Sequence, residues 1–180
     1  KRIGGDDLNL MSVSSMFDAA ELVGNEVRNT IAANVAGQQS QSGIDYSCTF
    51  LLGGQIKGEQ PRLFLIYSAG NFIEATRETP YFQIGESKYG KPIIDRVVKP
   101  ETSLREAVKC ALVSFDSTMR SNLSVGLPID LALVNTDACQ VTFRHRIESN
   151  DPYFGTISEQ WGEGLKQVFN ALHPPDWLDI

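Results

Sequence analysis

The chain has 180 residues, a hydrophobic content of 42%, a charged content of 21% and a formal net charge of −6. This balance is typical of a soluble globular protein and, at this length, of one ordinary domain. The negative charge argues against a nucleic-acid partner, because neutralising phosphates requires a basic surface. No apolar run approaches the ~20 residues of a membrane-spanning helix, so we expect no membrane partner.

The three cysteines, Cys48, Cys110 and Cys139, are odd in number and widely spaced. A disulfide framework or a zinc site would be expected to show close pairs, so three reduced thiols are the favoured interpretation. The opening residues, KRIGGDDLNLM, lack the apolar stretch of a secretory signal. Both observations predict a cytoplasmic protein.

The first half of the chain predicts one helix followed by strands. Apolar residues recur every three or four positions from Met16 to Val35, and Gly37 follows as a terminator. Ser15 and Asp18 resemble a capping box at the start of this helix. Runs rich in β-branched and aromatic residues then predict strands over 46–52, 62–67, 72–75 and 81–84, the second of them apolar enough to be buried on both faces.

The second half predicts three helices and two strands. Ser103 and Glu106 form a capping box ahead of an apolar stripe that extends to Met119. Around that helix, the pattern predicts helices over 91–98 and 152–172 and strands over 129–134 and 140–147. The aromatic residues of the last helix, Trp161 and Phe169, are interpreted as core or interface residues, with the core favoured.

One-sided helices on both sides of neighbouring strands indicate a layered α/β sandwich, and not a parallel βαβ repeat. No linker divides the chain, so we expect residues 1–180 to form a single domain. The segment Arg144-His145-Arg146 is interpreted as solvated charge at a strand edge.

Self-contained catalytic chemistry is scarce in this sequence. The two histidines, His145 and His173, lie among arginines and in the C-terminal tail, which makes a Ser-His-Asp arrangement improbable. No phosphate loop, dinucleotide-binding glycine pattern or zinc-protease helix is present in the sequence. The carboxylates Glu21, Glu26 and Asp116 are interpreted as solvated residues on helix faces.

Two polar segments leave a functional interpretation open. Residues 120–126, RSNLSVG, crowd hydroxyl and amide groups between a helix and a strand. They are either an ordinary helix end, which is favoured, or a hydrogen-bonding shelf beside an active site. Residues 84–92, IGESKYGKP, place two glycines where a strand leads into a helix, and turn chemistry and function explain them about equally well.

Three stretches resemble the proteasome β-subunit family, and in particular its bacterial Anbu ("ancestral β-subunit") branch. They are FLLGGQIKGEQPRLFLIYSAGNFIEA, TPYFQIGESKYGKPIIDRV and KCALVSFDSTMRSNLSVGLPIDLALV, and the likeness extends from about Met16 to Trp177. The resemblance implies the four-layer αββα sandwich of the N-terminal-nucleophile hydrolases. The chain is then the C-terminal part of such a subunit, because its first helix matches the second helix of the family.

In this family an N-terminal threonine attacks an amide carbonyl, and its own α-amine serves as the base. The resemblance therefore implies a threonine-type peptidase subunit that acts on peptide or amide bonds. We expect that the nucleophile, with the family's lysine, aspartate and oxyanion glycine, is not in this chain, which leaves the enzyme assignment open. The alternative is a catalytically silent assembly or regulatory subunit with the same fold.

The supporting residues of the family's active site can be carried over by position. Ser124 falls on the serine of an Arg-Asp-x-x-Ser-Gly-Gly loop, and Ser121 stands where that loop has its aspartate. In the family's Gly-Ser-Gly region, either Glu86 or Ser87 takes the serine's place. The resemblance implies a homo-oligomer, either a ring or a stacked open assembly, and no metal or organic cofactor.

Overall fold

The computed structural model of the chain describes residues 9–37 and 45–178. The elements follow the order α1 (Met16–Gly37), β1 (Phe50–Gly54), β2 (Arg62–Ile66), β3 (Phe72–Glu74), α2 (Lys91–Val97), α3 (Leu104–Ser121), β4 (Ile129–Leu133), β5 (Phe143–Ile147) and α4 (Pro152–Ala171). The chain divides into two compact units, Lys1–Gly85 with Ala132–Phe143 and Glu86–Leu131 with Arg144–Ile180.

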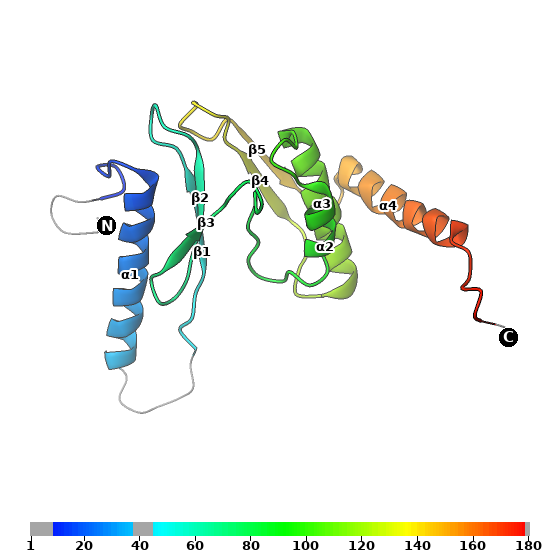
Figure 1. Cartoon of the computed structure of the whole chain (residues 1–180), viewed down its shortest axis with the longest axis horizontal. Helices are drawn as coiled ribbons and strands as arrows, with labels where there is room; N and C mark the ends of the chain where they lie inside the picture. The colour runs from blue at the N-terminus through cyan, green and yellow to red at the C-terminus, as the bar shows by residue number, and fades with distance from the viewer. Residues whose placement is uncertain (1–8, 38–44, 179–180) are drawn as a thin grey trace. The chain divides into compact units, whose positions relative to one another are not determined.

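The first unit is built on a three-stranded antiparallel sheet in the order β1-β2-β3. Leu51 lies opposite Leu65, which in turn lies opposite Ile73. Helix α1 runs alongside this sheet (Figure 1). The apolar side chains between them form one buried cluster, made of Met16, Ala20, Phe64 and Ile66 with Val23, Leu52, Ile56 and Phe72 at its border. Side chains alternate between the two faces of a strand, so Phe64 and Ile66 of β2 face the helix while Leu63 and Leu65 do not.

Two glycines allow α1 to approach the turn between β2 and β3 closely. A Cβ on Gly70 would lie 2.6 Å from the carbonyl oxygen of Gly24, and Gly70 itself has a φ of +85°. Only glycine adopts this backbone conformation without strain, and only the absence of both side chains permits this separation. The turn between β2 and β3 therefore also serves as the contact point of the helix.

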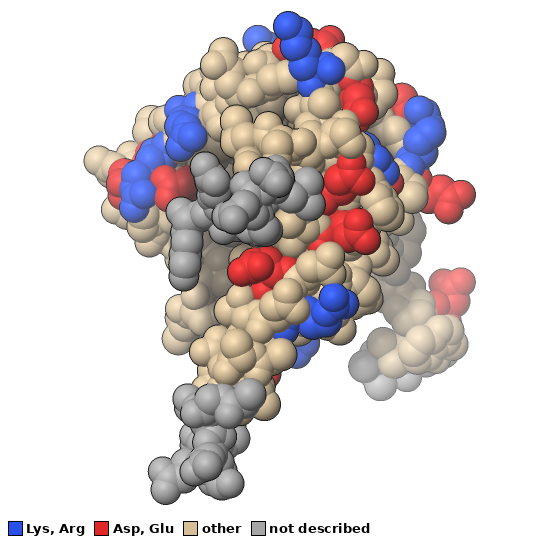
Figure 2. Space-filling view, turned by 90° about the vertical axis from the view of Figure 1, so that its left-hand side faces the viewer, with Lys and Arg blue, Asp and Glu red and all other residues tan. Residues whose placement is uncertain are grey.

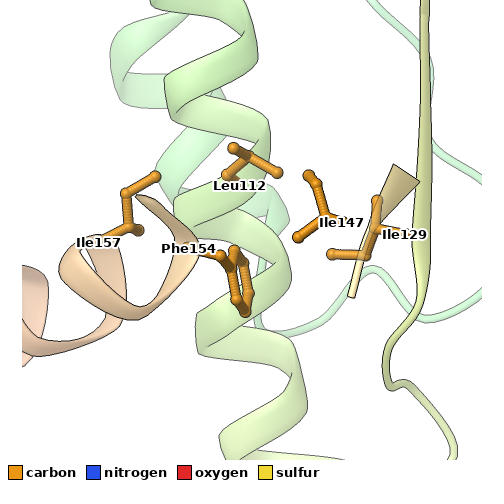
Figure 3. Packing of buried hydrophobic residues seen from close by; sticks show 5 residues of the cluster. All are labelled: Leu112, Ile129, Ile147, Phe154 and Ile157. Carbon is orange, nitrogen blue, oxygen red and sulfur yellow. The ribbon is translucent and has the colours of Figure 1, made fainter. Parts of the chain in front are cut away.

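The second unit buries its own apolar cluster (Figure 3). Leu112 projects from α3, Ile129 and Ile147 come from β4 and β5, and Phe154 and Ile157 come from the first turns of α4. Helix α3 begins at the predicted capping box, in which Ser103 Oγ accepts from the Glu106 N–H at 3.3 Å and the Glu106 carboxylate accepts from the Ser103 N–H at 3.3 Å.

Helix α4 begins at Asp151, whose carboxylate accepts a hydrogen bond from the Phe154 N–H at 2.8 Å. This backbone donor, together with His145 at 3.3 Å, lowers the pKa of Asp151, although desolvation partly opposes the shift. Proline at the first helical position follows, as is common at helix starts.

The cap predicts a pH dependence of stability. The pKa of Asp151 is lower in the folded than in the unfolded chain. The ionised carboxylate therefore stabilises the fold at a pH above its unfolded pKa of about 3.9, and this stabilisation is lost as the pH falls through its folded pKa. Asp151→Asn, which keeps the oxygen acceptor but not the charge, is expected to unfold at a lower temperature than wild type at neutral pH. The difference in unfolding temperature between wild type and Asp151→Asn should shrink as the pH falls below the usual aspartate range. A difference that stays constant with pH would contradict the prediction. Thermal unfolding monitored by circular dichroism measures the difference.

The helices agree with the sequence predictions to within a residue or two, whereas the strands differ. Residues 46–49 are not in a strand, and β1 instead continues through Gly53 and Gly54, beyond the predicted end at residue 52. β5 begins at Phe143, three residues after its predicted start at Gln140. The predicted strand over 81–84 is wrong, because these four residues lie outside the strands of the structure. Leu63 and Leu65 are only half-buried, so β2 is not covered equally on its two faces.

The last helix differs from its predicted role. Trp161 is half-buried, but Phe169 is 73% exposed, and its neighbours Val168 and Leu172 are exposed as well. The preference for Phe169 as a core residue is therefore wrong within the described chain. Only the first turns of α4 contribute to the buried cluster.

Acidic and basic side chains are interspersed among uncharged residues on the face shown in Figure 2. The predicted edge charge is also found, since Arg146 is exposed and its guanidinium binds both carboxylate oxygens of Asp130 at 2.9 Å. In the described parts of the chain, none of the helices has the length and apolar character needed to span a membrane.

Candidate functional site

The polar loop after α3 begins with an asparagine. Asn122 is the C-cap of the helix, and its backbone N–H donates to Thr118 O at 2.8 Å. Ser121, the last residue of the helix, and Ser124, within the loop, are both exposed. The end of α3 and the loop therefore each carry an exposed serine, and Asn122, which lies between them in the sequence, is partly buried.

The Asn122 side chain joins this loop to the segment before α2. Its Nδ2 donates to Glu86 Oε2 at 2.8 Å, although the two residues are 36 positions apart. Its Oδ1 accepts from the Ser124 N–H at 2.8 Å and from the Ser124 Oγ–H at 2.7 Å. One amide thus connects a carboxylate to a hydroxyl group.

Glu86 has partners on both carboxylate oxygens. Oε1 accepts from the Lys88 N–H at 2.9 Å, while Oε2 accepts from Asn122. The Lys88 backbone donor, the Asn122 amide and the charge of Lys88 all lower the pKa of Glu86, and desolvation opposes them. Glu86 is therefore ionised at neutral pH, since these contacts lower its pKa from an ordinary value that already lies well below neutrality.

A close contact between α2 and α3 holds these two segments side by side. Gly90, the buried N-cap of α2, faces Ser114 and Thr118 of α3. A Cβ on Gly90 would overlap with Ser114 Oγ and would lie 2.9 Å from Thr118 Oγ1. The residue type at position 90 thus determines how closely the segment that carries Glu86 can approach the end of α3.

A second polar group lies one turn before the loop. The Asp116 side chain is buried, and its carboxylate oxygen Oδ2 lies 3.5 Å from Arg120 Nε. Arg120 also donates from Nη2 to Ser158 Oγ of α4 at 3.1 Å. The interpretation of Asp116 as a solvated helix residue is therefore wrong, whereas Glu21 and Glu26 are indeed exposed.

The structure brings Ser124 and Glu86 together through Asn122, and it leaves Ser121 exposed at the end of the helix. Ser87, the alternative to Glu86, is half-buried, and its carbonyl accepts from the Lys91 N–H at 3.0 Å. The sequence prediction did not single out Asn122 as a site residue. A usable signal was its position two residues before a serine, where asparagine commonly forms a local side-chain turn.

No group of three or more His, Cys, Asp or Glu residues in the described ranges could hold a metal ion. Cys110 is buried, which raises the pKa of its thiol.

Known proteins with solved structures match nearly the whole chain. Anbu (ancestral beta-subunit) from Yersinia bercovieri is 51% identical, with a TM-score of 0.86, over 99% of this chain and 72% of that one. Anbu from Hyphomicrobium sp. strain MC1 is 46% identical, with a TM-score of 0.86, over 98% of this chain and 71% of that one. Of the curated proteins, none matches.

The family model described as "Proteasome subunit" matches residues 21–134. The chain belongs to the proteasome subunit family. Its mixed α/β fold is the proteasome-type fold of these Anbu structures, as the resemblance implied. A third member, from Pseudomonas aeruginosa, is 45% identical, with a TM-score of 0.86, over 99% of this chain and 73% of that one. Its solved structure is a helical assembly of the Anbu complex.

Proposed function

We propose that the chain is the C-terminal part of a self-assembling proteasome-type subunit that hydrolyses peptide or amide bonds with an N-terminal threonine. In this proposal the nucleophile is supplied by a segment that precedes Lys1 in the complete protein. The observation that carries the proposal is the contact of Ser124 and Glu86 through Asn122, within a chain that matches Anbu structures at 45–51% identity.

The proposed reaction needs only groups that a threonine and its surroundings provide. The hydroxyl oxygen attacks the amide carbonyl, its proton passes to the α-amine, and the amine then protonates the leaving nitrogen. The resulting ester is hydrolysed by water, which regenerates the hydroxyl. The residues of this chain support the amine: Ser124 accepts a hydrogen bond from it, and Glu86 provides the negative charge that Ser121 cannot provide.

We propose further that the protein is a homo-oligomer, either a ring or a stacked open assembly, located in the cytoplasm. The helical assembly formed by the Pseudomonas aeruginosa protein supports self-association by similarity. Symmetric or helical assembly of identical subunits requires only one kind of repeated contact.

Ser121 stands where the family's loop has an aspartate, and this difference favours a second candidate function, that of a catalytically silent assembly or regulatory subunit. A hydroxyl group does not stabilise an ammonium ion as an aspartate would, so the amine would be less well tuned for proton transfer. An activity assay separates the two candidates.

Hydrolysis of peptide amides of aminomethylcoumarin by the assembled protein tests the proposal. Wild type is expected to release coumarin, and Ser124→Ala is expected to reduce kcat/KM by about tenfold to a hundredfold, because a misplaced amine commonly costs on the order of a hundredfold. Asn34→Ala serves as a matched control, since its exposed amide bonds to Thr30 O within α1. A wild-type assembly that shows no release above the blank supports the silent subunit.

A further inference from the structure

The direction of the hydrogen bond between Ser124 and Asn122 determines what the serine can offer to another group. Ser124 Oγ donates its proton to Asn122 Oδ1 at 2.7 Å. A hydroxyl has one proton and two lone pairs, so an Oγ whose proton is already used can act only as an acceptor toward a further partner. Because Ser124 is exposed, those lone pairs are accessible to a group outside this loop.

The direction of this bond depends on which way the Asn122 amide faces, and Glu86 fixes that orientation. An ionised carboxylate only accepts hydrogen bonds, so the group that lies 2.8 Å from Glu86 Oε2 must be the amide NH₂. The amide oxygen then faces Ser124, where it also accepts from the backbone N–H at 2.8 Å. The reversed amide would place its oxygen against a carboxylate and its NH₂ against an N–H donor, which leaves both contacts repulsive.

Further contacts, most of them of the backbone, hold Asn122 and the Glu86 segment in place. Asn122 is fixed as the C-cap of α3 by its N–H bond to Thr118 O. The Glu86 segment is fixed by the Lys88 N–H and by the close approach of Gly90 to Ser114. A partly buried amide held between the Glu86 carboxylate and the Ser124 backbone N–H has little freedom to rotate.

We propose that Asn122 is a positioning residue that holds Ser124 Oγ as a hydrogen-bond acceptor for the N–H groups of the nucleophile's α-amine, with its own orientation set by Glu86. This inference rests on the proposed function and adds to it a residue and a direction. An acceptor at this place orients the amine so that its lone pair is free to take the proton of the attacking hydroxyl.

Two substitutions at Asn122 separate its two contacts. Asn122→Ala removes both, whereas Asn122→Asp keeps an oxygen that accepts from Ser124 and loses the donor to Glu86. Ser124→Ala leaves the Asn122 contact with Glu86 intact. Each variant keeps the backbone N–H that caps α3, and circular dichroism checks that it folds.

The first readout is the titration of the Glu86 carboxyl by ¹³C NMR in the assembled protein, which requires no catalysis. Asn122→Ala is expected to raise the pKa of Glu86 because the amide donor is lost. Asn122→Asp is expected to raise it further, since a second carboxylate faces the first, and Ser124→Ala is expected to leave it unchanged. An unchanged titration in Asn122→Ala would overturn the inference.

The second readout is kcat and KM for the coumarin amides. Asn122→Ala is expected to lower kcat by about tenfold or more with little change in KM, because a misoriented group commonly costs on the order of a hundredfold. Asn122→Asp should retain more activity than Asn122→Ala although it perturbs Glu86 more, which a purely structural role does not predict. Equal activity of wild type and Asn122→Ala would overturn the inference about Asn122 but not the proposed function. An inactive wild type with the expected titrations would instead overturn the proposed function.

Discussion

Phe64→Ala is expected to lower the free energy of unfolding of the first unit by about 3–5 kcal/mol, which is the usual cost of removing a buried aromatic ring. Phe64 is fully buried at the centre of the cluster between α1 and the sheet. Its ring also meets that of Phe72 edge-on with centroids 5.6 Å apart, and the Arg62 guanidinium lies 5.0 Å above it. The substitution removes all of these contacts and leaves a cavity.

Urea unfolding followed by circular dichroism measures this loss. Phe169→Ala is the matched control, because the same atoms are removed from a side chain that is 73% exposed. We expect the control to change the stability of the chain by less than about 0.5 kcal/mol. A loss below about 1 kcal/mol for Phe64→Ala would mean that the cluster around it does not hold α1 on the sheet.

Gly90→Ala is expected to destabilise the second unit by about 1–3 kcal/mol, the usual cost of adding a methylene to a packed contact. The new methyl group would overlap with Ser114 Oγ, so α2 must move away from α3. Because Glu86 lies just before this helix, its 2.8 Å contact with Asn122 should lengthen as well. The pKa of Glu86 should therefore rise toward its ordinary value.

Gly126→Ala provides a control in the loop itself, since a Cβ there meets nothing within 4 Å. Its effect on unfolding is expected to be close to zero. Adding Ser114→Ala to Gly90→Ala should recover part of the lost stability, because it removes the oxygen that the new methyl group meets. If Gly90→Ala and Gly126→Ala unfold alike, the close approach of α2 to α3 is not what fixes the Glu86 segment.

Local sequence signals were sufficient for the helices but not for the strands. Ser103 with Glu106 and the proline at position 152 mark helix starts through contacts within one turn, so the pattern alone locates them. A strand is stabilised by a partner that is distant in sequence, which is why residues 81–84 were predicted wrongly from composition. An apolar stripe likewise identifies a helix face without showing what covers it, as Phe169 illustrates.

The candidate site was accessible to sequence reasoning only in part. Ser124 and Glu86 came from the resemblance to the proteasome family, residue by residue. The contact that joins them through Asn122 spans 36 positions and depends on a glycine at position 90, neither of which is visible in local patterns. Asp116 was misjudged for a similar reason, because the position of a carboxylate on a helix does not reveal whether tertiary packing buries it.

The most direct test of the proposed function is the intact mass and N-terminal sequence of the native, assembled protein. The proposal predicts a mass greater than that of these 180 residues and a free threonine at the N-terminus. A protein whose first residue is Lys1, with no companion fragment in the assembly, would contradict the hydrolase and leave an assembly role.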